Sequence, residues 1–238
     1  RYKMYVPTTD IGFASHIVMD GYWEPWLTVF MAERIQPGWR VVDVGANHGY
    51  YTVLMGDLVG DNGRVIAVEP AQATAAFLRR NLYVNGLDQR VEVVEAAAGE
   101  TAGQQLYFLN PAGEPKNARL IDATAAQGRQ DVSVVPTMTL DNHLLSGAKI
   151  DFLKLDVEGA EEAALKGAWG IIERERPMIM AEINLERCSQ PAALLTGLEA
   201  IYGRTFAINH NSGLDVVSVE DVCASARSDD WMLFYQVE

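Results

Sequence analysis

The sequence predicts an α/β protein with a mostly parallel sheet covered by helices on both faces. From Trp39 onward, short apolar runs rich in β-branched residues alternate with stretches of helical periodicity. This alternation is typical of strand–helix–strand units, in which each helix returns the chain to begin a parallel neighbour. The 238 residues suffice for one large domain or two small ones. Because no internal repeat or interdomain linker interrupts the pattern, we expect one globular unit.

The elements of this sheet can be placed along the chain. Five short apolar runs predict buried strands, and two later runs predict an antiparallel pair that closes the sheet. The second predicted helix has apolar residues at helical spacing and is followed by Gly86, a residue typical of helix ends. The predicted strands are Arg40–Val44, Val65–Val68, Val91–Val94, Phe152–Leu155, Met178–Ile183, Thr205–Ile208 and Trp231–Tyr235, and the helices are Tyr50–Val59, Gln72–Asn85 and Pro191–Tyr202.

Two segments depart from the alternation. Residues 1–38 precede the first strand and form an N-terminal helical cap segment, with a helix predicted over Glu24–Ile35. Residues 103–140 are interpreted as an insertion within the main domain, residues 39–238. Two β-like runs, 104–109 and 131–136, enclose a polar centre near 110–130 that we expect to be mobile.

Composition narrows the possible partners. The chain has 19 basic and 32 acidic residues, a formal net charge of 19 − 32 = −13, and an acidic surface repels phosphate backbones. We therefore expect no nucleic acid partner. Cys188 and Cys223 are far apart, which predicts free thiols in a cytoplasmic protein. No apolar run reaches the length of about 20 residues that a membrane span needs. Composition leaves the oligomeric state open.

The turn after the first strand, DVGANHGYYT, has the features of a ligand-binding loop. Gly45 and Gly49 permit close approach to the backbone, and the following helix offers free N–H groups. The alternative is a plain strand-to-helix turn. The glycine spacing differs from the GxGxxG of dinucleotide sites, and a phosphate loop would need GK[ST]. Asp43, which precedes the glycines, suits a ligand with a positively charged amino group.

Two further strand ends favour a nucleoside. The second strand ends in AVEP and places Glu69 where a carboxylate can accept hydrogen bonds from both ribose hydroxyls. A surface acid or a helix cap is the alternative. The third strand leads into EAAAGE, in which Ala96 and Ala97 leave room for a flat ring.

The stretch IDFLKLDVEGAE carries the leading catalytic candidate. Lys154, Asp156 and Glu158 alternate along a predicted strand, so they share one face until the strand ends. Asp156 at the carboxyl tip is the predicted general base, although an orienting structural acid is the alternative. Lys154 is expected to pair with Glu182 or another acid. Glu182 and Asn184 follow the next strand and are predicted to share the acceptor pocket.

Other acids near this stretch have plainer interpretations. Glu158 is expected to open the next helix, Glu161 and Glu162 to be solvated, and Asp141 to cap the helix that it begins. Asp156, Glu182 and Asn184 are also oxygen ligands of the kind that Mg²⁺ accepts. No dedicated ligand loop is present, so a metal-free mechanism is favoured. His210 is a further, weaker catalytic candidate.

Taken together, the motifs resemble those of S-adenosylmethionine-dependent methyltransferases, and more narrowly of the FkbM family. The glycine loop is common to many methyltransferases. The combination of a TLD motif, KLDVEGAE and a strand ending in AEIN is much more specific. The ordered motifs are GYWEPW (21–26), VVDVGANHGYYT (41–52), VIAVEP (65–70), RNLYVNGL (80–87), MTLDNHL (138–144), IDFLKLDVEGAE (150–161) and PMIMAEIN (177–184).

The resemblance implies a Rossmann-like class I methyltransferase fold, with a seven-stranded sheet and a reversed C-terminal hairpin. It implies methyl transfer to an oxygen of a small molecule, a sugar or glycolipid, or a natural product. Glu69 would bind the ribose beside Pro70, Ala97 would lie near the adenine, and Glu24 would reach over the cofactor, which Asp156 would also face. His48 departs from the expected aliphatic residue. The amino-acid end of S-adenosylmethionine would be surrounded by Asp43, Gly45, Ala46, Asn47 and Gly49.

Two other functions were weighed. A module that binds S-adenosylmethionine or a related nucleoside without turnover would need the loop and Glu69 but not the second polar cluster around Asp156. The absence of GxGxxG argues against an NAD-dependent oxidoreductase. An O-methyltransferase is therefore the preferred prediction, with its acceptor unidentified.

Overall fold

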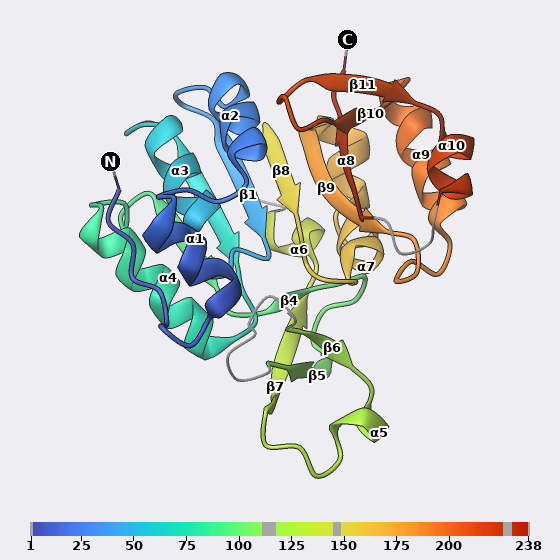
Figure 1. Cartoon of the computed structure of the whole chain (residues 1–238). Helices are drawn as coiled ribbons and strands as arrows, with labels where there is room; N and C mark the ends of the chain where they lie inside the picture. Colours follow the sequence, from blue (N-terminus) through green and yellow to red (C-terminus); the bar gives the residue numbers. More distant parts are fainter. Residues whose placement is uncertain (1, 111–117, 145–148, 226–229, 238) are drawn as a thin grey trace.

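Eight strands form the main sheet of the computed structural model, which describes residues 2–110, 118–144, 149–225 and 230–237 (Figure 1). Their spatial order is β11-β10-β12-β9-β8-β1-β2-β3, with β12 antiparallel to both β9 and β10. The reversed closing pair is confirmed, but the edge strand β11 makes the sheet one strand larger than predicted. The strands are β1 (Arg40–Val44), β2 (Arg64–Val68), β3 (Val91–Val94), β8 (Phe152–Leu155), β9 (Met178–Asn184), β10 (Thr205–Ile208), β11 (Leu214–Val217) and β12 (Asp230–Tyr235).

Helices cover both faces of this sheet and bury a separate core on each (Figure 1). Side chains alternate between the two cores along a strand: Val41 packs with the first group of helices and Val42 with the second. Within the described ranges, no helix is both long and apolar enough to cross a membrane. The first group is α2 (Pro25–Arg34), α3 (Tyr50–Leu58) and α4 (Gln72–Val84), and the second is α6 (Leu140–Leu144), α7 (Glu161–Lys166), α8 (Trp169–Glu175), α9 (Pro191–Tyr202) and α10 (Val219–Ala224).

Helix α4 shows how the sequence fixes these elements. Ala75, Leu78 and Leu82 recur at spacings of three and four residues, so they form one apolar stripe, and all three are buried. Asn85 ends the helix, and Gly86 follows with φ 67°, a left-handed conformation that favours glycine. The predicted helix and its end are confirmed.

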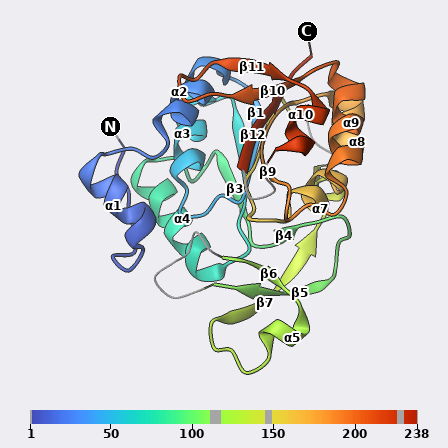
Figure 2. The same cartoon turned by 45° about the vertical axis from the view of Figure 1, so that its right-hand side comes forward.

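The predicted insertion forms a small second sheet in the order β4-β7-β5-β6, which lies beside the main sheet in Figures 1 and 2. Both predicted β-like runs are strands, and Phe108 and Val135 pack with Ala97 in a small core. Residues 118–126 of the predicted mobile centre include a strand and a helix, and its residues 111–117 lie outside the described residues. The elements are β4 (Ala97–Ala98), β5 (Gln105–Leu109), β6 (Arg119–Ile121), α5 (Ala123–Ala126) and β7 (Val132–Met138).

The N-terminal segment contains a helix that the sequence did not predict, α1 (Ile11–Met19). Asp10 begins it, because its Oδ1 accepts a hydrogen bond from the backbone N–H of Phe13 at 3.1 Å. In Figure 1, α1 lies next to α3 and α4, at the side of the main sheet. The segment thus contributes α1 and α2 to the surroundings of the glycine loop.

Strand register gathers the polar side chains of the sheet on one face. Asp43 pairs with Lys154 across β1 and β8, and Lys154 pairs with Met180 across β8 and β9. Met180 packs in the core beneath α2 and α3, so Asp43 and Lys154 point to that face. Glu182 lies two residues after Met180 and shares its side. The polar groups of three adjacent strands therefore meet below α2 and α3.

Candidate active site

A buried ion pair forms the floor of the site. Lys154 Nζ lies 3.2 Å from Asp43 Oδ1 and 3.6 Å from Asp156 Oδ2, and Lys154 and Asp43 are 2% and 0% exposed. Thr52 Oγ1 donates to Asp43 Oδ2 at 2.6 Å. Burial lowers the pKa of Lys154, but the Asp43 and Asp156 carboxylates outweigh it and raise the pKa overall. Of the two predicted alternatives for Lys154, Glu182 or another acid, the second is confirmed: its partners are Asp43 and Asp156.

The glycine loop passes close to the end of β8. A Cβ on Gly45 would lie 1.8 Å from the carbonyl oxygen of Asp156, and its φ of 77° also favours glycine. Lys154 Nζ donates to the Gly45 carbonyl at 3.2 Å. Asn47 has a left-handed φ of 49°, and its Oδ1 is buried without a hydrogen-bond partner among the described residues. The loop therefore presents an unpaired acceptor beside the floor of the site.

Glu69 lies where the sequence predicted a ribose-binding acid. Its Oε2 accepts the backbone N–H of Asn47 at 3.0 Å, and its Oε1 accepts that of Ala71 at 2.9 Å. Burial raises the pKa of Glu69 to about 7, although both backbone hydrogen bonds favour the charged form. Each carboxylate oxygen has a further acceptor position. Glu69 can therefore hold a diol while it also fixes the glycine loop.

An apolar pocket adjoins Glu69 on the side of the second sheet. The small residues after β3 form one wall, and Phe108 and Leu120 of the second sheet form another. An apolar pocket, a buried carboxylate and an unpaired amide oxygen match the adenine, ribose and amino-acid parts of S-adenosylmethionine. The residues present thus fit this cofactor. The lining includes Val44, Gly45, Val68, Pro70, Ala96, Ala97, Ala98, Val157 and Ala160.

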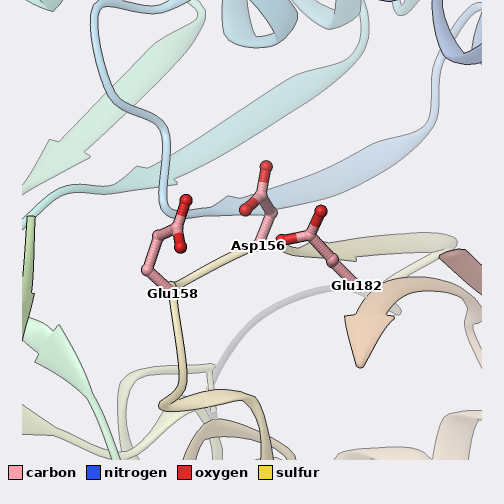
Figure 3. Close-up of side chains that lie close together, drawn as sticks. All are labelled: Asp156, Glu158 and Glu182. Carbon is pink, nitrogen blue, oxygen red and sulfur yellow. The ribbon is translucent and has the colours of Figure 1, made fainter. Parts of the chain in front are cut away.

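Three carboxylates converge at the ends of β8 and β9, as Figure 3 shows. Asp156, Glu158 and Glu182 each place one oxygen atom within 4.8 Å of the other two. Asp156 pairs with Lys154, and Glu158 accepts a hydrogen bond from Arg187 Nη1 at 2.7 Å. Among the described residues, Glu182 has no cationic partner. The arrangement can bind a divalent cation or hold a proton in place of one.

Proton retention is favoured at Glu182. Burial is the largest cause that raises its pKa, to about 9, and the nearby carboxylates of Asp156, Glu158 and Asp230 add to the effect. A carboxyl group with this pKa is protonated at neutral pH and can donate a hydrogen bond. The cluster therefore combines Asp156, which pairs with Lys154, with a neutral Glu182.

Glu24 and Tyr51 close the site from the N-terminal side. Glu24 precedes α2 with a left-handed φ of 38°, and the Tyr51 hydroxyl donates to its Oε2 at 2.6 Å. Burial raises the pKa of Glu24, and the Asp156 carboxylate adds to that shift. The Tyr51 ring centroid lies 5.3 Å from Lys154 Nζ. The place of Tyr51 in the first turn after the glycine loop is the sequence signal that could have identified it.

Asn184 is bonded within the turn that follows β9. Its Nδ2 donates to Asp230 Oδ1 at 2.7 Å, and its Oδ1 accepts the backbone N–H groups of Glu186 and Arg187. Glu158 joins Asp156 and Glu182 in the converging group of acids, and Asn184 as a further metal ligand stays a prediction. A role for Asn184 in the acceptor pocket remains a prediction.

Three acids near the end of β8 lie in surroundings that differ from those predicted. Glu158 lies in a turn with φ 53°, three residues before α7 begins. Glu161 and Glu162 were predicted to be solvated, which is wrong: both are buried. Glu161 accepts the backbone N–H groups of Val157 and Gly159, and Glu162 those of Ser189 and Gln190.

Asp141 was predicted to cap the helix in which it lies, and this too is wrong. Its carboxylate instead accepts the backbone N–H groups of Gly170 and Ile171, at 2.9 and 2.8 Å. These groups lie in the first turn of α8, whose free N–H donors a carboxylate satisfies. Tertiary contact, rather than sequence adjacency, decided which helix Asp141 caps.

Comparison with known sequences identifies the family. Residues 43–200 match the family described as "Methyltransferase FkbM domain". The chain belongs to the FkbM methyltransferase family. This FkbM chain is accordingly a methyltransferase domain dependent on S-adenosylmethionine, and the predicted cofactor is confirmed. The matched range includes the glycine loop, Glu69 and the three converging carboxylates.

Named relatives of this FkbM chain cover different parts of it. A protein-L-isoaspartate O-methyltransferase of Aeropyrum pernix is 36% identical over 115 residues, which are 47% of this chain and 43% of the relative. Methyltransferase sdnD of Sordaria araneosa is 27% identical over 188 residues, 68% of this chain and 70% of the relative. The chain thus spans less than half the length of the Aeropyrum relative.

The solved structure of methyltransferase FkbM from Methylobacillus flagellatus KT shares the fold of this FkbM chain. The TM-score is 0.55 at 18% identity, and the match covers 98% of this chain and 48% of that one. At this identity the likeness concerns the fold alone. It supports the Rossmann-like class I assignment, with the main sheet and its reversed closing pair.

Proposed function

We propose that the chain methylates a hydroxyl oxygen of a neutral or cationic small molecule or sugar. S-adenosylmethionine, when bound, supplies a methyl group on a positively charged sulfur. The acceptor oxygen forms a bond to that methyl carbon as the carbon–sulfur bond breaks, its electron pair stays on sulfur, and the hydroxyl proton leaves. What the chain must provide is in-line positioning and a proton acceptor.

Asp156 is the proposed general base. It follows β8, directly behind the glycine loop, and its Oδ2 lies 3.6 Å from Lys154 Nζ, which holds the carboxyl group in place. Glu182, whose pKa is raised to about 9, is protonated at neutral pH and donates a hydrogen bond to the acceptor oxygen or its neighbour. The juxtaposition of these two carboxyl groups is the observation that carries the proposal.

The charge around these groups limits the acceptor. Glu24, Asp156, Glu158 and Glu182 act on one another electrostatically, whereas the cations close to them are Lys154 and Arg187, each already paired. An acceptor with a carboxylate or phosphate would meet repulsion here. This disfavours the carboxyl chemistry named for the Aeropyrum relative, and it disfavours nucleic acid.

An aromatic pair supplies a wall for a ring-shaped acceptor. Trp26, two residues after Glu24, lies edge-on to His210, with ring centroids 4.7 Å apart. Ser212 Oγ donates to the Trp26 carbonyl at 2.8 Å, which ties the loop after β10 to the start of α2. The apolar face of a sugar ring can stack on such a side chain. This contact supports a sugar or another cyclic alcohol as acceptor.

A panel of matched acceptors tests the proposal. We would incubate the chain with methyl-labelled S-adenosylmethionine and three aryl glycosides, a hexose, its amino sugar and its uronic acid, together with polyketide and peptide acceptors. The proposal expects the hexose or the amino sugar to gain one methyl group. Transfer only to carboxylates would contradict it. Cofactor binding without any transfer across the panel would favour the non-catalytic binding module.

A further inference from the structure

The helix end RNLYVNGL contributes two asparagines that hold the N-terminal strap, which we define as residues 2–10. Asn85 Oδ1 accepts the backbone N–H of Lys3 at 3.0 Å, and its Nδ2 donates to the Lys3 carbonyl at 2.7 Å. Asn81 repeats this pattern one helical turn earlier: its Oδ1 accepts from Tyr5 N at 2.6 Å and its Nδ2 donates to Tyr5 O at 3.0 Å. Two side-chain amides thus bind the strap through alternate residues.

Both asparagines make a third contact, but Asn85 makes it within its own helix, where Nδ2 donates to the Asn81 carbonyl at 2.7 Å, whereas Asn81 reaches another loop. Its Nδ2 also donates to the His48 carbonyl at 2.7 Å, within the cofactor loop, which we define as residues 45–49. Asn81 is fully buried, and both hydrogens of its amide are used. The neighbouring Asn47 donates its backbone N–H to Glu69, the ribose-binding acid of the cofactor pocket. The cofactor loop is therefore held on one side by Glu69 and on the other by Asn81.

The His48 side chain lies against α1 and the end of the strap. His48 is 2% exposed and stacks on Phe13 of α1, with ring centroids 5.7 Å apart and an interplanar angle of 21°. Its Nδ1 lies 3.8 Å from Asp10 Oδ2 at the end of the strap. The strap thus lies near the side chain of His48 through Asp10 and is linked to its backbone through Asn81.

We propose that Asn81 is a positioning residue for the cofactor: it fixes the cofactor loop through His48 and couples that loop to the N-terminal strap. The inference rests on the proposed function only in placing the cofactor at this loop. Asn81 touches no reacting group and acts only through the cofactor loop. Its loss should therefore weaken the binding of the cofactor. Coupling is reciprocal, so bound cofactor also stabilises the strap.

Matched isosteric variants test the first part of the proposal, that Asn81 fixes the cofactor loop. Asn81→Asp keeps the acceptor for Tyr5 N–H but loses both donors. Asn85→Asp likewise loses two donors, to the carbonyls of Lys3 and Asn81, but neither partner belongs to the cofactor loop. Calorimetry with S-adenosylhomocysteine should give a Kd about tenfold weaker for N81D, the change expected when a buried acceptor is left unpaired, and within about twofold of wild type for N85D. Equal Kd values for wild type and N81D, or equal losses in both variants, would overturn the proposal.

Hydrogen exchange tests the second part of the proposal, the coupling between the cofactor loop and the strap. It uses the wild-type chain, so the result does not depend on whether a variant folds. Saturating S-adenosylhomocysteine should slow exchange at the amides of Tyr5 and Asn47, while the Asp221 amide in α10 serves as the distant control. Unchanged exchange at Tyr5 alongside slowed exchange at Asn47 would disprove the coupling. If the wild type did not bind S-adenosylhomocysteine at all, the proposed function would fail as well. Failure of the coupling alone can therefore be told apart from failure of the proposed function.

Discussion

Asp43 and Glu182 lie on the same face of the main sheet but in opposite electrostatic surroundings. Asp43 is fully buried, and Lys154 and Thr52 satisfy its charge and one of its oxygens. Glu182 is less buried, yet its nearest ionisable groups are other carboxylates, and burial together with these groups raises its pKa to about 9. A buried acid that pairs with a cation, such as Asp43, has a structural role. A buried acid that lies among other acids, such as Glu182, keeps a proton that it can donate in the reaction.

The largest effect should come from breaking the compensated pair. Lys154→Met removes the cationic partner of the buried Asp43, which costs about 3–5 kcal/mol of unfolding free energy and lowers Tm by roughly 10 °C. Scanning calorimetry measures the change. Lys166→Met is the control, because Lys166 pairs with Glu162 at 2.9 Å but is 39% exposed, so its loss costs less than about 1 kcal/mol. Similar Tm values for the two variants would show that the buried pair contributes little.

A smaller, pH-dependent effect should come from Glu182. Its folded pKa of about 9 exceeds the ordinary value of 4.5, so the folded state binds a proton that the unfolded state has lost. Stability therefore falls as pH rises from about 4.5 to about 9. Glu182→Gln removes this loss, and we expect Tm to rise by at least about 5 °C at pH 8.5 and to stay unchanged at pH 4.

The exposed Glu186, four residues further along, provides the matched control for this measurement. Glu186→Gln should leave Tm unchanged at both pH values. A gain in E182Q that is the same at pH 4 and pH 8.5 would mean that packing, rather than proton binding, accounts for it.

The smallest effect is expected from adding or removing a divalent cation. This experiment tests whether a cation takes the place of the proton on Glu182. Asp156, Glu158 and Glu182 could hold Mg²⁺, yet the proposed mechanism is metal-free. We expect EDTA to leave turnover within about twofold and 5 mM MgCl₂ to leave Tm within about 1 °C, since a ligand that binds only the folded state would raise it. Loss of activity in EDTA, restored by Mg²⁺, would refute the metal-free mechanism.

Local patterns predicted the sheet well and the partners of its polar residues less well. β1 and β8 have the bounds expected from their apolar runs, and Asp156 stands at the predicted strand tip. Burial of Glu161 and Glu162 could not be read from the chain, because it depends on amides of the folded turns around Gly159 and Ser189. The eighth strand was also missed, because β11 is a short edge strand with two exposed residues.

Long-range contacts account for the rest. Neither a motif nor a spacing brings Asn81 to Tyr5, which lies 76 residues away in the sequence. The Tyr51–Glu24 hydrogen bond likewise depends on where α2 crosses α3. In both cases the residue types were visible, but their partners were set by how the helices pack on the sheet.

Replacement of Asp156 tests the central claim most directly. In single-turnover methyl transfer with the acceptor found in the panel, Asp156→Asn should be at least about a hundredfold slower than wild type, the usual contribution of a general base. Its Kd for S-adenosylhomocysteine should stay within about threefold, and the exposed substitution Asp88→Asn should change neither quantity. A D156N variant that transfers methyl at more than about a tenth of the wild-type rate would contradict the assignment of Asp156 as the base.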